Sequence, residues 1–425
     1  MHSVKDATDA APSQDAGELR ESRNLAVLIA QQMLFRTGWI FKTESVIMPA
    51  FLDSITPHGW IRGMLPPLNR FGQSITPLLL SDRISEAPRK ARWVTLTLLM
   101  MSLPFLLLGA SLLIVDGDRP TWYPAFFLAA YGAFFCIHGV NQATYSTIIG
   151  KLVQPDRRGR LIALAGTAGS VLAVTTAWLL MKPWTEHQPP HFSRIFLFTG
   201  TMFCFAALLA CLLQETPDFV KPQAVRRRHL RDSVVRLRVD PTLRRLCLAA
   251  ALFVCSQLLF PHYQRLGRQQ AGYRGDMLMI WVIAQNLGAA AFSWVSGRLA
   301  DSRGTRSALR CLFFSAVFAP LLPLTLASLV DAGYYWITFA WLGVVPVTFR
   351  MQMNYVLEIT ERVNHPIYVS TVVLCMAPPI VLSPLIGELV ERIGYAIPFC
   401  GISFLVFTGW LLTLTMVEPR HGSFS

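Results

Sequence analysis

Charge is scarce in this chain of 425 residues: Asp, Glu, Lys and Arg make up 15% of it, whereas 53% of the residues are hydrophobic. Ordinary soluble domains carry about 25% charged residues, so a soluble fold of this composition would lack the polar surface to cover itself. The shortage therefore favours a protein whose solvent is the lipid bilayer. The net charge of +13 does not indicate a nucleic-acid partner, because the basic residues stand in short clusters between apolar runs.

Sequence motifs of catalysis and metal binding are missing as well. The chain contains no HExxH, no GxSxG and no glycine-rich phosphate loop, and none of its eight cysteines forms a CxxC pair. We therefore expect no metal and no cofactor, and we interpret the cysteines as small apolar residues of the helices. An enzyme embedded in the membrane stays only as an alternative from another class.

Twelve apolar runs follow one another along the chain, each long enough to cross a hydrocarbon core about 30 Å thick as a helix. They predict an all-α integral membrane protein with twelve transmembrane helices, arranged as two pseudo-symmetric six-helix bundles around a central cavity. The runs cover residues 25–51, 60–81, 93–115, 121–149, 159–183, 194–214, 244–264, 275–299, 306–329, 333–357, 367–390 and 395–417.

A polar interval, residues 214–245, divides the runs into two sets of six and holds nine Lys and Arg residues. We predict a disordered cytoplasmic tail over residues 1–24, a six-helix bundle over 25–214, and a basic cytoplasmic linker over 215–243. A second bundle over 244–417 and a cytoplasmic tail over 418–425 complete the chain. Within the linker, residues 224–239 carry apolar side chains at helical spacing beneath many arginines, which predicts a short helix on the inner membrane surface.

The connections between the runs differ strongly in basic content. Of the 38 Lys and Arg residues, 26 fall on the side of the N-terminus and eight on the other side. Because basic loops stay in the cytoplasm, we predict cytoplasmic termini and a location in the plasma membrane. No basic start leads into a short apolar core with a cleavage site, so no signal peptide is expected. Four basic residues are left inside the runs: Arg36, Lys42, Arg70 and Arg350.

The two halves of the sequence repeat each other. Met48–Phe51 and Phe260–Tyr263 stand at matching places of the first and seventh runs, and Gln214–Pro217 and Val417–Arg420 end the sixth and twelfth runs in the same way. Matches of this kind support a duplicated six-helix unit.

The loop from Gly297 to Arg306 has a Gly separated from an Asp by three residues, and then a Gly and a basic residue. With the twelve runs and the basic linker, it resembles the major facilitator superfamily of secondary transporters. The matching first-half loop keeps the acid and the basic end but has Leu78 in place of the Gly. The resemblance implies a latch on the cytoplasmic side made by Asp301 and Arg306, and by Asp82 and Arg83; solvated loop charges are the alternative.

Three polar residues share one depth. Arg36, Arg70 and His138 each stand about eleven residues from the cytoplasmic end of their helix, which is about 16 Å at 1.5 Å per residue. Arg350 lies somewhat shallower. A charge at that depth costs about 2.5–3.5 kcal/mol, so we expect these side chains to face a wet cavity or a partner, not lipid. Pairing of Arg350 with Glu358 or Glu361 is the alternative for that residue, and Lys42 is expected to extend to the outer interface.

Amide side chains lie at helical spacing beside His138 on the fourth run and Arg350 on the tenth, and others stand on the seventh and eighth runs. In the superfamily that the chain resembles, helices 1, 2, 4 and 5 and their counterparts 7, 8, 10 and 11 line the central cavity, which implies substrate contacts for these amides. A bond to a neighbouring helix is the alternative for each one. The predicted contacts are Asn141, Gln142, Gln257, Gln285, Asn286 and Asn354, beside Arg36, Arg70, His138 and Arg350.

The cavity then holds more positive than negative groups, which an anionic or strongly hydrogen-bonding solute would offset. We predict a secondary transporter of a small polar, anionic solute that works by alternating access. Proton coupling through Glu44 with His138 as a relay is a second hypothesis. An exporter of drugs or amphipathic metabolites and a sensor on the same fold are the alternatives. The expected partners are the solute, protons and the bilayer, without nucleic acid, and we expect a monomer.

Overall fold

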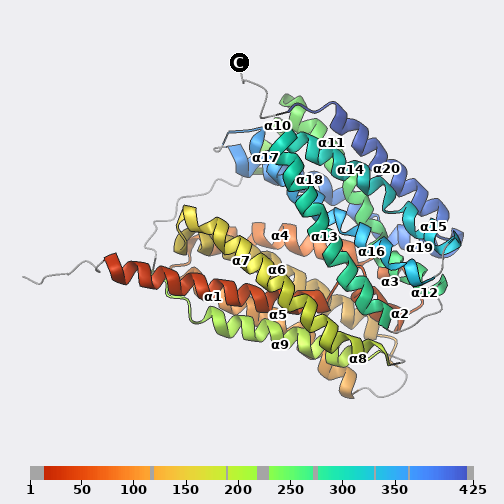
Figure 1. The fold of residues 1–425 in the computed structure, drawn as a ribbon, viewed down its shortest axis with the longest axis horizontal. Coiled ribbons are helices and arrows are strands. Elements are labelled where there is room, and N and C mark those ends of the chain that lie inside the picture. Colours follow the sequence, from red (N-terminus) through yellow and green to blue (C-terminus); the bar gives the residue numbers. More distant parts are fainter. Residues whose placement is uncertain are drawn as a thin grey trace, which may run out of the picture.

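The computed structural model describes residues 14–114, 119–187, 190–217, 229–270, 276–329, 332–361 and 364–418, and within these ranges every regular element is a helix. Two lobes lie one above the other in Figure 1, the first coloured red to green and the second green to blue. The all-α architecture of two helical bundles that the sequence predicts is therefore confirmed.

The first lobe contains six spans, several of them built from more than one helix. Its elements are α1 (Gln14–Phe41), α2 (Ile47–Asp53), α3 (Gly59–Arg62), α4 (Leu65–Glu86), α5 (Lys90–Ile114), α6 (Tyr123–Leu152), α7 (Pro155–Thr176), the π-helix η1 (Ala177–Met181), α8 (Lys182–Thr185) and α9 (Phe192–Ala210).

The second lobe follows the linker helix α10 (His229–Val239). Its elements are α11 (Pro241–Val254), the 3₁₀ helix η2 (Cys255–Leu259), α12 (Phe260–Gln270), α13 (Asp276–Arg303), α14 (Thr305–Phe318), α15 (Leu321–Leu329), the 3₁₀ helix η3 (Ala332–Tyr334), α16 (Trp336–Leu342), α17 (Val344–Glu358), α18 (His365–Val381), α19 (Ser383–Ile393) and α20 (Ala396–Leu414).

The N-terminal segment differs from the prediction. Helix α1 begins at Gln14, so residues 14–24 are helical and do not form the expected disordered tail; residues 1–13 lie outside the described part. The side chain of Asn24 explains why this stretch is held in place. It donates to the carbonyl oxygen of Gln214 and accepts from the Gln214 N–H, both at 2.9 Å, which ties α1 to the end of the sixth span.

The first and seventh spans are both interrupted, at matching places in the two lobes. Between α1 and α2 the backbone leaves the helix over residues 42–46, and between α11 and α12 it narrows into η2. A proline follows each interruption, Pro49 in α2 and Pro261 in α12, and proline fits the first turn of a helix because its missing N–H has no partner there. Irregular backbone within a membrane is tolerated where it is buried in protein or lines water.

The duplicated ends of the sixth and twelfth spans have a structural role. Glu215 accepts from the Ala91 N–H at 2.7 Å, at the start of α5, and from Lys151 Nζ at 2.7 Å. In the second lobe Glu418 pairs with Arg306 Nε at 3.6 Å, at the start of α14. Each carboxylate thus holds the first turn of the third span of its lobe, α5 or α14, where a negative charge is stabilising.

The second lobe starts at a well-defined cap. Asp240 precedes Pro241 and accepts hydrogen bonds from the N–H groups of Thr242 at 2.8 Å and Leu243 at 3.1 Å. Its other oxygen accepts from the Tyr368 hydroxyl at 2.7 Å, which joins the start of α11 to α18. A side-chain cap of this kind contributes about 1 kcal/mol to a helix.

Charge separates the spans into two groups. Nine helical runs within the described residues are long and apolar enough to cross a membrane. The first, second and tenth predicted spans are outside this group, and they carry the four intramembrane basic residues Arg36, Lys42, Arg70 and Arg350. Polar residues that weaken a membrane span mark a functional site by default.

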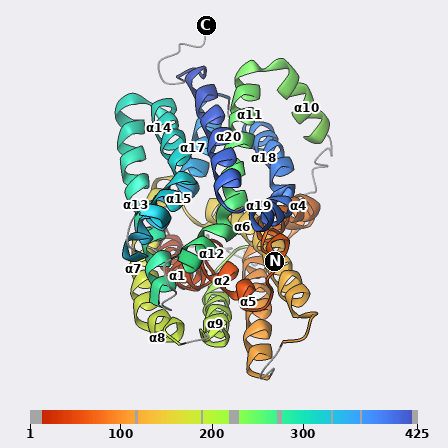
Figure 2. The same cartoon turned by 90° about the vertical axis from the view of Figure 1, so that its right-hand side faces the viewer.

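The lobes meet mainly at one end of the molecule, which we call the closed end. There α3 packs on α19, α2 packs on α12, and α13 packs on η1 and α8. Backbones approach closely, because a Cβ on Gly59 would lie 2.4 Å from the carbonyl oxygen of Gly387. Figure 2 views this end, with α2, α12 and α19 near the boundary between the lobes. The N-terminal end of α1 and the helix α10 lie at the opposite end, which we call the open end (Figure 1).

Candidate substrate site between the lobes

Two arginines face each other across the boundary between the lobes. Arg36 of α1 and Arg350 of α17 are both exposed, and they lie close enough for their charges to repel each other. Arg36 Nη1 donates to Ser170 Oγ at 3.4 Å, and Arg350 Nη2 donates to Ser293 Oγ at 3.1 Å. Among the described residues neither guanidinium is paired with a carboxylate, so the pairing of Arg350 with Glu358 or Glu361 is not seen.

Small residues make room for Arg36. A Cβ on Gly169 of α7 would lie 2.8 Å from Arg36 Cδ, so a larger residue there would push the arginine out of its groove. The absence of a side chain at this position lets the long aliphatic part of Arg36 lie against α7. Tyr145 and Gln32 lie beside each other near Arg36.

Arg70 of α4 takes a different environment from Arg36. Its guanidinium lies 5.2 Å from the ring centre of Phe349, and Nη2 is 3.7 Å from Met376 Sδ. Both partners belong to the other lobe. Arg70 is thus a cation–π contact between the lobes, next to the Arg36–Arg350 space but less open to solvent.

The interruption of the first span holds an ion pair. Lys42 Nζ lies 2.9 Å from Glu44 Oε1, and the lysine side chain is fully buried. Aromatic rings surround the ammonium group, which is 3.2 Å from the ring centre of Trp39 and 4.2 Å from that of Phe135. The expectation that Lys42 extends to the outer interface is therefore wrong: because the helix ends at Phe41, the side chain turns inward to these rings and to Glu44.

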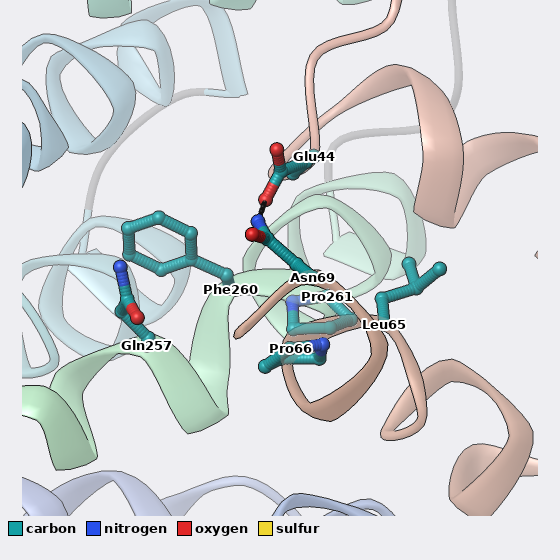
Figure 3. A pocket seen from close by; sticks show the side chains of 7 residues that line it. All are labelled: Glu44, Leu65, Pro66, Asn69, Gln257, Phe260 and Pro261. Atoms are coloured by element: carbon teal, nitrogen blue, oxygen red, sulfur yellow. Dashed lines mark hydrogen bonds between the residues drawn. The ribbon is translucent and has the colours of Figure 1, made fainter. Parts of the chain in front are cut away.

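Glu44 also joins the first span to the second. Asn69 donates to its second carboxylate oxygen, and Gln73 donates in turn to Asn69, as Figure 3 shows for the first of these bonds. Sequence reasoning missed Asn69, although it precedes Arg70 on a polar turn of the helix. The continuous run 25–51 had implied that Glu44 is inside a helix, but the residue lies in the interruption between α1 and α2.

Amides of the second lobe approach the same interruption. Ser45 Oγ donates to Gln285 Oε1 at 2.5 Å, a bond between the lobes. Gln257 in η2 lines a cavity of about 20 Å³ together with Glu44, Asn69, Phe260 and Pro261 (Figure 3). That volume has room for about one water molecule. Glu44, Gln257 and Gln285 are thus brought together.

His138 and Asn141 are not in the space where they were expected. His138 is 9% exposed and packs against the rings of Trp39 at 4.7 Å and Phe35 at 5.9 Å, so aromatic side chains of its own lobe cover it. Asn141 donates to Thr97 Oγ1 at 2.8 Å, which turns it toward α5 of its own lobe. Both corrections have one cause. Helical spacing predicts which residues share one face of a helix, but not which neighbouring element packs against that face.

Three other predicted contacts are exposed side chains. Gln142 lies on α6, one turn before Tyr145, and Asn354 lies on α17, one turn beyond Arg350. Asn286 on α13 donates to the Val282 carbonyl oxygen of its own helix at 2.8 Å. Gln142 and Asn354 thus extend the polar surface around Arg36 and Arg350, whereas Asn286 is partly satisfied by its own helix.

The predicted latch residues lie at the open end. Arg306 donates to the Met416 carbonyl oxygen at 2.9 Å and pairs with Glu418, all within its own lobe. Asp301 and Arg83 are exposed, and the side chain of Asp82 lies outside the described part. Gly304 has φ +90°, and a Cβ there would lie 2.3 Å from Glu418, so the loop glycine has a steric reason.

An ionic network at the closed end was missed by sequence reasoning. Arg62, which is fully buried, contacts Asp53 Oδ1 at 2.7 Å and Glu391 Oε1 at 2.8 Å. Arg265 contacts the same oxygen of Glu391 at 3.0 Å. Burial raises the pKa of the Asp53 carboxyl to about 7, while the charges of Arg265 and Arg268 oppose this shift, and so does the direct contact with Arg62. No local sequence signal links residues 329 positions apart.

Comparison with known proteins identifies the class. Residues 71–362 match the model of the Major Facilitator Superfamily, and the chain belongs to this family. It is therefore a multi-pass membrane protein of a transporter family, with a small-molecule solute as the expected cargo. Among curated proteins, it is 29% identical over 170 residues to uncharacterised proteins of Mycobacterium tuberculosis and Mycobacterium bovis. That match covers 38% of this chain and only 30% of the length of each relative.

Solved structures show the same fold over nearly the whole chain. A bacterial homologue of the human lysosomal transporter Spinster, in an inward-facing and unoccupied conformation, covers 96% of this chain and 99% of its own at TM-score 0.67 and 13% identity. The nucleoside transporter NupG covers 94% of this chain and 100% of its own at TM-score 0.67 and 8% identity. At such identities the likeness establishes the fold alone.

Proposed function

We propose that the protein moves a small polar, anionic solute across the membrane by alternating access, with Arg36 and Arg350 as the groups that bind the anion. The observation that carries this proposal is a pair of exposed guanidinium groups on opposite lobes, neither of which has a carboxylate partner in the part of the chain that the structure describes. Two like charges held near each other at membrane depth are unfavourable without a counter-charge. A carboxylate or phosphate between them would supply it and would make charge-assisted hydrogen bonds to both lobes.

The place where the lobes touch supports alternating access. The lobes pack together at the closed end, and the basic connections at the open end favour a cytoplasmic location for that end. In this assignment the structure is open to the cytoplasm, and Arg70, Gln257 and Gln285 lie toward the closed side of the bound anion. The latch residues Asp82, Arg83, Asp301 and Arg306 would meet across the lobes only when the open end closes.

Proton coupling stays a separate proposal. Glu44 lies in the interruption of the first span, where it is paired with Lys42 and Asn69. A relay through His138 has weaker support, because Trp39 and Lys42 lie between the two groups.

The test is a thermal-shift screen of the purified full-length protein against small carboxylates and phosphates, each beside its neutral amide or alcohol analogue. A ligand that binds only the folded protein raises Tm with its concentration. We expect one or more anions to raise Tm, their neutral analogues to have no effect, and the shift to vanish in Arg36→Gln and in Arg350→Gln. Arg160→Gln, which removes an exposed charge from α7, is the control. Equal shifts with the neutral analogues would rule out an anion site.

A further inference from the structure

The network at the closed end is balanced in charge within each lobe. Asp53 and Arg62 belong to the first lobe, and Arg265 and Glu391 belong to the second. Each lobe therefore contributes one acid and one base. The short contacts inside the lobes, 2.7 Å for Arg62–Asp53 and 3.0 Å for Arg265–Glu391, would persist if the lobes separated as rigid bodies.

Contacts between the lobes are formed by the same four side chains. Arg62 reaches Glu391 at 2.8 Å, and Arg265 lies 4.0 Å from Asp53 and donates to the Pro57 carbonyl oxygen at 3.1 Å. Arg62 is fully buried here, whereas Arg265 is 24% exposed. The bridge from Arg62 to Glu391 is the shortest and most buried of these contacts, so loss of one partner would leave a buried charge uncompensated.

A cavity with room for water adjoins the network. It has a volume of about 360 Å³ and is lined by Asp53, Thr56, Pro57, Arg265, Arg268 and Gln269. Charges that leave a buried network for water recover their hydration. Separation of the lobes from this side would expose two neutral pairs and no unpaired charge.

We infer that Asp53, Arg62, Arg265 and Glu391 form a latch of the closed end that divides into two neutral ion pairs, Asp53–Arg62 and Arg265–Glu391, when the transporter opens there. The closed state is held by the Arg62–Glu391 bridge and by the close backbone contact of Gly59 with Gly387. Because each half keeps its own counter-charge, the latch can be specific for one closed geometry and still open reversibly. This inference rests on the alternating access proposed above but not on the identity of the solute.

The test measures the distance between the lobes at the closed end. Spin labels are placed at Trp122→Cys and Tyr334→Cys, exposed positions at that end of the first and second lobe, with the exposed Cys211, Cys311 and Cys400 replaced by serine. Double electron–electron resonance at pH 8, where Asp53 is ionised, gives the ratio of long to short distances. We expect Glu391→Gln to raise this ratio about tenfold or more. Such a change lies between the small effect of breaking an exposed ion pair and the large effect of breaking a buried one.

The matched control is Glu388→Gln on the same helix, which removes the same charge from a pair with Arg392 inside α19; it should leave the ratio unchanged. In a double-mutant cycle, Arg62→Gln should add little to Glu391→Gln, because the bridge is already lost. An unchanged ratio in Glu391→Gln, or an equal shift in Glu388→Gln, would overturn the latch while leaving anion binding in the thermal-shift screen untouched. Loss of anion binding with the latch intact would overturn the proposed solute alone.

Discussion

Charged residues of the two lobes meet at two levels of the molecule, and they are treated differently at each. At the closed end Arg62 and Arg265 share Asp53 and Glu391, so every charge of that network has a protein partner. Midway along the helices, Arg36 and Arg350 donate to the hydroxyl groups of Ser170 and Ser293, and no carboxylate among the described residues pairs with either. The difference separates structure from function: a paired arginine holds two lobes together, whereas an arginine without a counter-charge is ready to receive one from a ligand.

Removal of both unpaired charges should have the largest effect. A hydrogen bond between charged groups contributes about 1.5–3 kcal/mol, so Arg36→Gln with Arg350→Gln should weaken anion binding by a factor of about one hundred to ten thousand. Isothermal titration of the anion found in the screen measures this. Folding should be unaffected, because relief of the repulsion between the two arginines offsets the loss of their bonds to Ser170 and Ser293. An affinity within a factor of three of the wild type would contradict the role of these two arginines in anion binding.

Breaking the buried pair at the interruption of the first span should rank next. Glu44→Gln leaves Lys42 buried without a counter-charge, and removal of one partner of a buried pair costs about 3–5 kcal/mol. We expect a marked fall in Tm, and partial recovery when Lys42→Met is added. Uptake into proteoliposomes with and without a pH gradient tests proton coupling in the same variant. Uptake that responds to the gradient equally with and without Glu44 would exclude this residue from the coupling.

A carboxylate introduced beside Arg350 should give this arginine a partner within the protein. Ser293 lies 3.1 Å from Arg350, so Ser293→Asp should form an ion pair there. Anion affinity should then fall by about tenfold, because the ligand must compete with the new partner, while Tm rises slightly, since a partly exposed pair contributes up to about 1 kcal/mol. Ser293→Ala removes the hydroxyl without adding charge and serves as the control. A Ser293→Asp protein that binds the anion as tightly as the control would contradict the role of Arg350.

The sequence predicted the two sets of apolar helices and the position of Arg36, Arg70 and Arg350 within helices, because apolar length and the place of a charge can be read along one chain. The prediction of side-chain positions was wrong where they depend on neighbouring elements. Lys42 turns inward because α1 ends at Phe41 and aromatic rings lie beside it, and His138 packs against Trp39. Arg62 and Glu391 lie in separate lobes, and their contact depends on how the lobes pack, which no local pattern encodes.

The central claim is that one anion is held by both lobes through Arg36 and Arg350. The most direct measurement is an experimental structure of the full-length protein with the tightest-binding anion of the screen. We predict density for the anion between the two guanidinium groups, within hydrogen-bond distance of each. An anion bound to one lobe only, or at a place that neither arginine reaches, would contradict it.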